Sequence, residues 1–332
     1  MSKAYRKLVV TIFIFSSSVA YCGALKIINS MDLPGSPGKR FDYLKIDPDN
    51  HYLFSAHLGN NQTYVIDLKI EKLLKVITDT PGVEGIEYVP EGHKIYTSNW
   101  RDKTIGVIDL SKMKVIKKIP AYAKPDGSAY ASPFHKLYVS DERAKKLIVI
   151  DIVKDVVIKT LDFKSETGMT RFDPVKKKIY LNLQDQNLFA VINPETDTLE
   201  GTFPIDKCHG NHGMALDSAN HLAFLACEEN NLISVFNLDL HKVVSDISIP
   251  DGVDVLEFDP GLKRLYAACY SGFISIIQEE TPSKFKKLED FKVQATTHSL
   301  AIDPETHKVY APTQEVDGQP ASRLYIYAAS VP

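Results

Sequence analysis

One short motif recurs seven times along the 332-residue chain, and it constrains the fold more than any other feature. Each copy is a hydrophobic stretch that ends in Asp-Pro or a near equivalent, and neighbouring copies are 41 to 44 residues apart. The copies are Asp47-Pro48, Val89-Pro90, Ser132-Pro133, Asp173-Pro174, Asp217-Ser218, Asp259-Pro260 and Asp303-Pro304. An apolar–aromatic pair such as Leu137-Tyr138 follows each copy, and an apolar run such as Val149-Ile150-Asp151 comes after it. The sequence is therefore that of a repeat protein with seven units.

Each unit has the composition of four β-strands, which we call A to D. β-Branched and aromatic residues dominate the runs, whereas Pro, Gly, Asn and Asp fill the gaps between them. Asp-Pro predicts a tight A–B turn, because proline presets φ and the aspartate side chain can accept bonds from the local backbone. Four-stranded units of about 40–45 residues are typical of β-propeller blades. The sequence thus predicts an all-β, seven-bladed β-propeller.

The two ends of the chain complement each other. The seventh unit ends one strand short, whereas LKIINSMDLPG at residues 25–35 resembles KLLKVITDTPG at residues 72–82, the last strand of the first unit. We therefore expect the N-terminal strand to complete the last blade and to close the ring, which removes exposed sheet edges. Residues 25–332 then form a single seven-bladed domain.

The first 24 residues have the features of a signal peptide. Lys3, Arg6 and Lys7 precede an apolar run at residues 8–15 and a series of small residues, and that run is too short to span a bilayer. Cleavage is expected after Ala20 or after Ala24, and lipid anchoring at Cys22 is the alternative. No other segment approaches a transmembrane span. The sequence therefore predicts a periplasmic or secreted protein.

The repeats resemble a known family. Lys136 to Ser140, followed by Val149 to Asp151, follow the pattern Lys-Leu-Tyr-Val-Ser … Val-Ile-Asp and resemble the YVTN-repeat, YncE-like propellers along the whole mature chain. This resemblance implies a secreted or periplasmic seven-bladed propeller. It does not choose between a binding protein and an enzyme, because related propellers include redox domains and lactonase-type hydrolases.

The net charge argues against one class of partner. Without the leader the chain has 36 basic and 42 acidic residues, a net charge of about −6. Nonspecific nucleic-acid binding needs cationic surface, so we do not expect it. The sequence carries no oligomerisation signal, and we expect a monomer.

Candidate ligand-binding residues gather at one end of the predicted channel, where the D–A and B–C connections share a face. Alignment of the A strands on their Asp-Pro copies predicts a first ring of Asp42, Glu84, Gly127, Gly168, His212, Asp254 and His298. The ends of the B strands predict a second ring of His57, Asn99, Asp141, Leu183, Cys227, Cys269 and Thr313, each roughly opposite its partner in the first ring. Trp100 is expected on the same face as a recognition anchor.

The stretch CHGNHGMALD at residues 208–217 leads into the fifth A strand and leaves several interpretations open. His209, His212 and His298 are candidate ligands of a divalent metal, the one cofactor that the sequence suggests. Cys208 and Cys227 are candidates for a disulfide, although the expected hairpin register places His212 rather than Cys208 beside Cys227. The rival interpretation is a Cys/His site for copper or zinc.

Two classes of function follow. The first is a noncatalytic binding or scaffold module that uses the face with the D–A and B–C connections for a small ligand or a protein, since the sequence shows no nucleophile–base motif. The alternative is a metal- or cofactor-dependent enzyme or a cofactor-maturation factor with a His/carboxylate site at the channel mouth.

Overall fold

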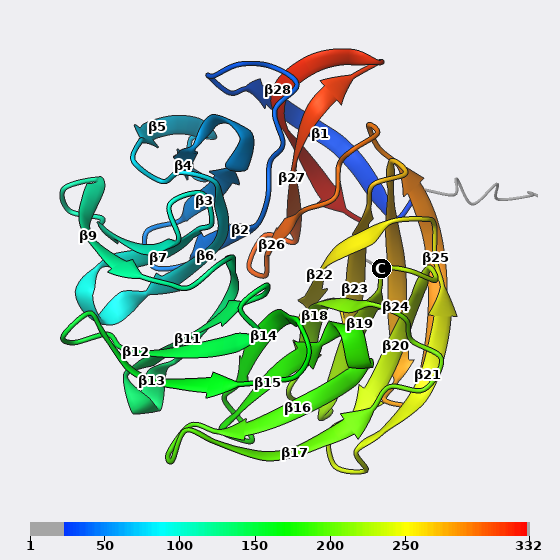
Figure 1. Ribbon diagram of the computed structural model, residues 1–332. Helices are drawn as coiled ribbons and strands as arrows, with labels where there is room; N and C mark the ends of the chain where they lie inside the picture. The colour runs from blue at the N-terminus through cyan, green and yellow to red at the C-terminus, as the bar shows by residue number, and fades with distance from the viewer. Residues whose placement is uncertain (1–22, 331–332) are drawn as a thin grey trace, which may run out of the picture.

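Seven four-stranded antiparallel sheets form a closed ring in the computed structural model, which describes residues 23–330 (Figure 1). The protein is therefore a seven-bladed β-propeller, as predicted. The predicted leader lies almost wholly outside the described residues. Within residues 23–330, no helix is long and apolar enough to cross a membrane.

The blades follow one another along the chain, each running from its inner strand to its outer strand. The first three blades are β2 (Leu44–Asp47), β3 (Tyr52–His57), β4 (Gln62–Asp67) and β5 (Lys72–Ile77); β6 (Val83–Val89), β7 (Lys94–Asn99), β8 (Thr104–Asp109) and β9 (Lys114–Pro120); and β10 (Pro125–Ala131), β11 (Lys136–Asp141), β12 (Lys146–Asp151) and β13 (Val156–Asp162). The next three are β14 (Thr167–Asp173), β15 (Lys178–Leu183), β16 (Leu188–Asn193) and β17 (Thr198–Pro204); β18 (Asn211–Asp217), β19 (Leu222–Cys227), β20 (Leu232–Asn237) and β21 (Lys242–Ser248); and β22 (Val253–Asp259), β23 (Arg264–Cys269), β24 (Phe273–Thr281) and β25 (Lys284–Lys292). Single 3-10 turns connect some of these strands: η1 (Leu58–Asn60), η2 (Pro90–Gly92), η3 (Ser132–Phe134) and η4 (Gln184–Gln186).

The last blade contains both ends of the domain. It consists of β26 (Ala301–Asp303), β27 (Lys308–Val316), β28 (Gln319–Ala329) and β1 (Leu25–Asp32). β1 pairs with β28 in antiparallel register, from Leu25 opposite Ala329 to Asp32 opposite Arg323. Figure 1 shows the blue N-terminal strand beside the red C-terminal strands. The predicted closure by the N-terminal strand is confirmed.

The core lies between blades. Within the described part of the chain, seven clusters of buried apolar side chains each bridge two neighbouring blades. This explains why strands such as Lys146–Asp151 are apolar on both faces: four consecutive residues from Leu147 to Ile150 are fully buried. The predicted A–B turns are also present, since Asp47 accepts bonds from the backbone N–H groups of Asp49 and Asn50.

Two glycines allow neighbouring inner strands to approach each other closely at the channel. A Cβ atom added to Gly85 would lie 2.0 Å from the carbonyl oxygen of Asp126, and one added to Gly213 would lie 1.9 Å from that of Asp254. Both contacts are with backbone, which cannot rotate away as a side chain could.

Gly213→Ala is therefore expected to lower the free energy of unfolding by about 1–3 kcal/mol, the usual cost of overpacking. Denaturant unfolding measures this cost. Gly92→Ala is the matched control, because the Cβ there would meet only the flexible side chain of Lys94 at 3.3 Å. Equal stability of the two variants would contradict this account.

Candidate functional site

A polar cavity of about 180 Å³ lies at the mouth of the central channel, on the face where the D–A and B–C connections meet. We call it the mouth pocket. Its walls come from residues at the start of the inner strands and from residues that directly follow the second strand of a blade. They are Arg40, Asp42, Glu84, Lys124, Asp126, Glu142, Gln184, His212, Glu228, Asp254 and Tyr270. Four residues of the predicted first ring, Asp42, Glu84, His212 and Asp254, are thus brought together.

The predicted first ring is wrong in the third blade. Glu84, His212 and Asp254 each occupy the second position of their inner strand, and in β10 that position is Asp126 rather than Gly127. The error comes from the motif used for alignment. The second A–B turn begins at Pro90, whereas the third begins at Ser132, so proline stands one position later in the third blade.

The predicted pairing of the two rings is also wrong by one residue. Cys227 pairs with Asn211 rather than with His212, and Asn99 pairs with Val83 rather than with Glu84. A register irregularity follows each of these pairs, so the second ring is displaced relative to the first. The residues that line the pocket each come one position after the predicted second-ring residue of their blade. They are Glu142, Gln184, Glu228 and Tyr270.

The second-ring residues are instead buried beneath the pocket wall. His57 stacks on Phe41 at 3.9 Å and bonds to the Tyr64 hydroxyl at 2.6 Å. Asp141 accepts hydrogen bonds from backbone N–H groups of the connection before β10, including that of Lys124 at 2.7 Å. These contacts organise the connections that carry the pocket residues.

Asn99 is buried as well, whereas Trp100, the next residue, is half-buried. The Asn99 side chain bonds to Thr104 at 3.4 Å. The Trp100 ring lies beside its neighbour Arg101, whose guanidinium is 5.8 Å from the ring centroid. Neither residue lines the mouth pocket.

His212 lies at the centre of the polar contacts of the pocket. Its Nε2 atom is 3.1 Å from the Tyr43 hydroxyl and 3.6 Å from Asp254 Oδ1, and its Nδ1 atom is 3.2 Å from Gln184 Oε1. Burial lowers the pKa of His212, but the carboxylates of Asp254 and Asp126 outweigh it, so the pKa is raised above 6.5.

His298 borders the pocket from the seventh blade. Its ring stacks on Tyr270 at 4.0 Å, and its Nδ1 atom donates to the carbonyl of Thr296 at 2.9 Å. The buried Nε2 atom has no hydrogen-bond partner among the described residues and lies 4.0 Å from Asp254 Oδ2.

Two cations offset part of the negative charge. Arg40 forms ion pairs with Asp42 at 3.1 Å and with Asp254 at 3.9 Å, and its guanidinium lies over the ring of Tyr270. Lys124 pairs with Glu142 and lies 3.7 Å from Glu84. Six of the eleven lining residues are nevertheless acidic.

Burial and mutual repulsion keep protons on some of these acids. Desolvation, followed by the charges of Asp126 and Asp42, raises the pKa of Glu84 to about 10. Desolvation also raises the pKa of Asp126 to about 6, although Lys124 and His212 oppose it. At neutral pH Glu84 is therefore protonated, whereas Asp126 is mostly ionised.

His209 lies away from the other two candidate metal ligands, His212 and His298, which both approach Asp254. His209 is exposed, and its backbone N–H donates to Asn230 Oδ1 at 3.1 Å, whereas His212 and His298 face the channel from different blades. Within residues 23–330, no group of three or more His, Cys, Asp or Glu side chains is arranged to hold a metal ion.

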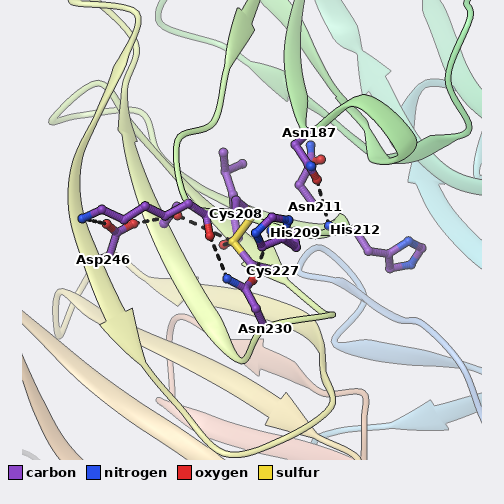
Figure 2. Close-up of a disulfide and its surroundings, with 12 residues drawn as sticks. Asn187, Cys208, His209, Asn211, His212, Cys227, Asn230 and Asp246 are labelled. Atoms are coloured by element: carbon purple, nitrogen blue, oxygen red, sulfur yellow. Dashed lines mark hydrogen bonds and ion pairs between the residues drawn. A yellow bond between two sulfur atoms is a disulfide. The ribbon is translucent and has the colours of Figure 1, made fainter.

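Cys208 and Cys227 are joined in a disulfide with an S–S distance of 2.03 Å and a Cα–Cα distance of 5.1 Å. Figure 2 shows His212 extending away from the sulfur atoms. The D–A connection folds back so that Cys208 reaches Cys227, even though Asn211 is the residue paired with Cys227 in the ladder. Cys269 is buried and free.

Seven pocket residues were missed by the sequence analysis, namely Arg40, Lys124, Asp126, Glu142, Gln184, Glu228 and Tyr270. One signal could have identified Asp126. A charged residue or histidine stands directly before glycine in Glu84-Gly85, Asp126-Gly127 and His212-Gly213. Aligning the second, third and fifth blades on that dipeptide instead of on the turn proline places Asp126 in the ring.

Solved structures share this fold. A chain of the mitotic checkpoint complex aligns with a TM-score of 0.79 at 12% identity, covering 100% of both chains. The RRP9 WD40 repeats align with a TM-score of 0.78 at 13% identity, covering 91% of this chain and 99% of that one. Hydrazine synthase of Kuenenia stuttgartiensis aligns with a TM-score of 0.71 at 15% identity, covering 84% and 93%. Neither a scan against protein-family models nor a search of curated proteins found a match. These similarities show the propeller fold alone.

Proposed function

We propose that this protein is a YVTN-like binding module of the periplasm or the extracellular space, and that its mouth pocket binds a positively charged group. The leader at residues 1–24 supports the location, and the repeat pattern supports the family. Propellers commonly serve as protein-binding scaffolds, so the charged group can belong to a small molecule or to a partner protein.

The charge of the pocket is the main support for a cationic ligand. With Glu84 protonated, five acidic residues remain around the cavity and outnumber the basic side chains Arg40, Lys124 and His212. Glu84 Oε2 is buried and has no hydrogen-bond partner among the described residues, whereas Asp42 Oδ2 has only its ion pair with Arg40 at 3.1 Å. A buried oxygen without a partner is costly, and a ligand N–H group would satisfy Glu84 Oε2 and supply a second partner for Asp42.

The size of the pocket limits the ligand. A cavity of about 180 Å³ is smaller than the usual site of a drug-sized molecule. It accommodates an ammonium or guanidinium group with a short stem, either as a free amine or as a Lys or Arg side chain of a partner. We expect recognition through the cationic end, with the rest of the ligand outside the pocket.

Binding of butylammonium is expected to weaken several-fold between pH 7.5 and pH 5, as measured by calorimetry. As the pH falls through about 6, Asp126 takes up a proton and the pocket loses a negative charge. Protonation of His212 adds positive charge in the same direction. Asp126→Asn is expected to bind about tenfold more weakly at pH 7.5 and to lose much of the pH dependence.

Asp162→Asn is the matched control, because this carboxylate is mostly exposed on the outer strand of the same blade. Butanol, which has the same stem without the charge, should not bind. Butylammonium affinity that is unchanged by pH and by Asp126→Asn would contradict the proposal.

Elemental analysis tests the enzymatic alternative: stoichiometric metal that is lost in His212→Ala and His298→Ala would favour a metal-dependent site instead.

A further inference from the structure

A clamp between neighbouring blades recurs around the ring on the face opposite the mouth pocket. At the start of the second strand of a blade, Lys and Tyr stand two residues apart and hold an acidic residue from a turn of the next blade. Lys94 pairs with Asp155 at 2.7 Å, and the Tyr96 hydroxyl donates to the same carboxylate. The clamp therefore has the form of a carboxylate receptor built from an ammonium and a hydroxyl.

The complete receptor occurs at one further junction, and its lysine ion pair at another. Lys136 pairs with Asp197 at 2.8 Å, and the Tyr138 hydroxyl donates to Asp197 as well. Lys308 of the last blade pairs with Glu71 of the first blade at 2.7 Å. Each junction thus supplies its own carboxylate from within the chain.

The junction between the fourth and fifth blades has the receptor but not the carboxylate. Lys178 and Tyr180 repeat the pattern, yet the turn residue that should face them is His241. Its φ of 50° matches the left-handed φ of 54° at Asp155 and of 53° at Asp197, so the backbone position is equivalent. His241 turns aside and stacks on Phe203 at 4.0 Å.

The polar groups of the receptor have changed partners as a result. Lys178 pairs at 2.5 Å with Glu200, a partly exposed residue of its own blade. The Tyr180 hydroxyl makes no hydrogen bond to any described residue, although the side chain is only 2% exposed. The hydroxyl itself is not fully buried: it reaches the cavity at this junction, where a carboxylate from outside the chain can accept its hydrogen bond.

A cavity of about 540 Å³ opens at this junction, and Lys178, Tyr180 and His241 line it. Val175, Val191 and Leu238 supply apolar walls. The other charges are paired with one another, since Asp239 holds both Lys176 and His221. The cavity combines apolar surface with one incomplete polar end, as small-molecule sites do.

We propose that this cavity binds an external carboxylate carried on an apolar body, which occupies the place that Asp155 and Asp197 hold at the two preceding junctions. The carboxylate accepts a hydrogen bond from the Tyr180 hydroxyl. It also forms an ion pair with the Lys178 ammonium, which keeps its ion pair with Glu200. The apolar body packs against Val175, Val191 and Leu238. The site is separate from the mouth pocket, so it goes beyond the proposed cation binding.

Calorimetric titration with hexanoate tests the site, with hexanol as the uncharged comparison. Hexanoate is expected to bind saturably and hexanol at least tenfold more weakly. Tyr180→Phe should weaken hexanoate binding at least tenfold. His241→Asp should abolish it, because the new aspartate fills the receptor from within. This variant is expected to fold, since aspartate tolerates positive φ and already stands at the equivalent positions.

Asp197→His is the matched control at the neighbouring junction, where it removes the internal carboxylate and should create hexanoate binding that the wild-type junction lacks.

A short peptide with a single glutamate and blocked ends distinguishes the source of the carboxylate. Tighter binding of the peptide assigns a protein partner, and tighter binding of hexanoate assigns a free carboxylic acid. Absence of saturable binding by both probes would overturn the proposal. So would affinities that are equal in the wild type, Tyr180→Phe and His241→Asp. Butylammonium binding at the mouth pocket should be unchanged in all three variants, which separates this test from that of the proposed function.

Discussion

Replacement of Cys208 by alanine is expected to lower the free energy of unfolding by about 3 kcal/mol, which is the effect of a cross-link that closes a loop of this length. The two cysteines are 19 positions apart, and both are buried in the cluster between the fourth and fifth blades. Cys227→Ala should cost about as much. The double variant should cost little more than either single variant, because the first replacement already removes the bond.

Denaturant unfolding with and without a reductant measures the effect. The wild type should lose stability in reductant, whereas the single variants should be insensitive to it. Cys269→Ala is the control, because it removes a buried free thiol and should keep the sensitivity of the wild type. Wild-type protein that unfolds at the same denaturant concentration in both conditions would show that the bond does not stabilise the fold.

Most of the fold could be predicted because its determinants are local and repeat seven times. The turn aspartates bond to their own backbone two and three residues on, as Asp173 does with Val175 and Lys176. The burial of both blade faces produces apolar runs that identify the strands. Closure by the N-terminal strand followed from the missing strand of the seventh unit, because an open ring would leave two sheet edges unpaired.

The channel mouth could be predicted only in part, because a shift of one residue changes which side chain faces the channel. The turn proline of the third blade stands one position late, so the alignment placed Gly127 where Asp126 lies. The irregular register near the mouth moved the second ring by one residue, so that Glu228 rather than Cys227 lines the pocket. The register irregularity leaves no periodic signal in the sequence.

Other features depend on contacts between distant segments. Arg40 and Asp254, which form an ion pair, are 214 positions apart in the sequence. The missing carboxylate at His241 is recognised only when its turn is compared with those of Asp155 and Asp197. The sequence analysis did not single out Arg40 or His241. Their roles follow from the closure of the ring, which places the first blade against the last and each turn against the preceding blade.

Glu84→Gln is expected to raise the free energy of unfolding near pH 8 by at most about 5 kcal/mol, at ~1.4 kcal/mol for each pH unit above the unfolded pKa. Glu84 is buried at the channel mouth, and desolvation together with Asp126 and Asp42 raises its pKa to about 10. In the unfolded chain the pKa is close to 4.5. Between these two values the folded state holds a proton that the unfolded state has released, so this group lowers stability as the pH rises. Glutamine keeps the shape and removes that cost.

The pH dependence gives the sharper test. Below about pH 4.5 the carboxyl is protonated in both states, so Glu84→Gln and the wild type should have nearly equal stability. The advantage of the variant should then grow from pH 4.5 towards pH 10. Glu142→Gln is the matched control in the same pocket. It removes the ion-pair partner of Lys124 and is expected to destabilise the protein at pH 8.

The outcome also bears on the ligand. A protonated Glu84 presents an O–H donor and a carbonyl acceptor to the pocket, which glutamine imitates, so Glu84→Gln should keep most of the affinity for butylammonium while Asp126→Asn loses it. If Glu84→Gln instead lowered stability at pH 8, and this loss faded as the pH fell below about 4.5, the carboxyl would be ionised and paired in the folded state. The negative charge of the pocket would then be greater by one, and Lys124, 3.7 Å away, would be its partner.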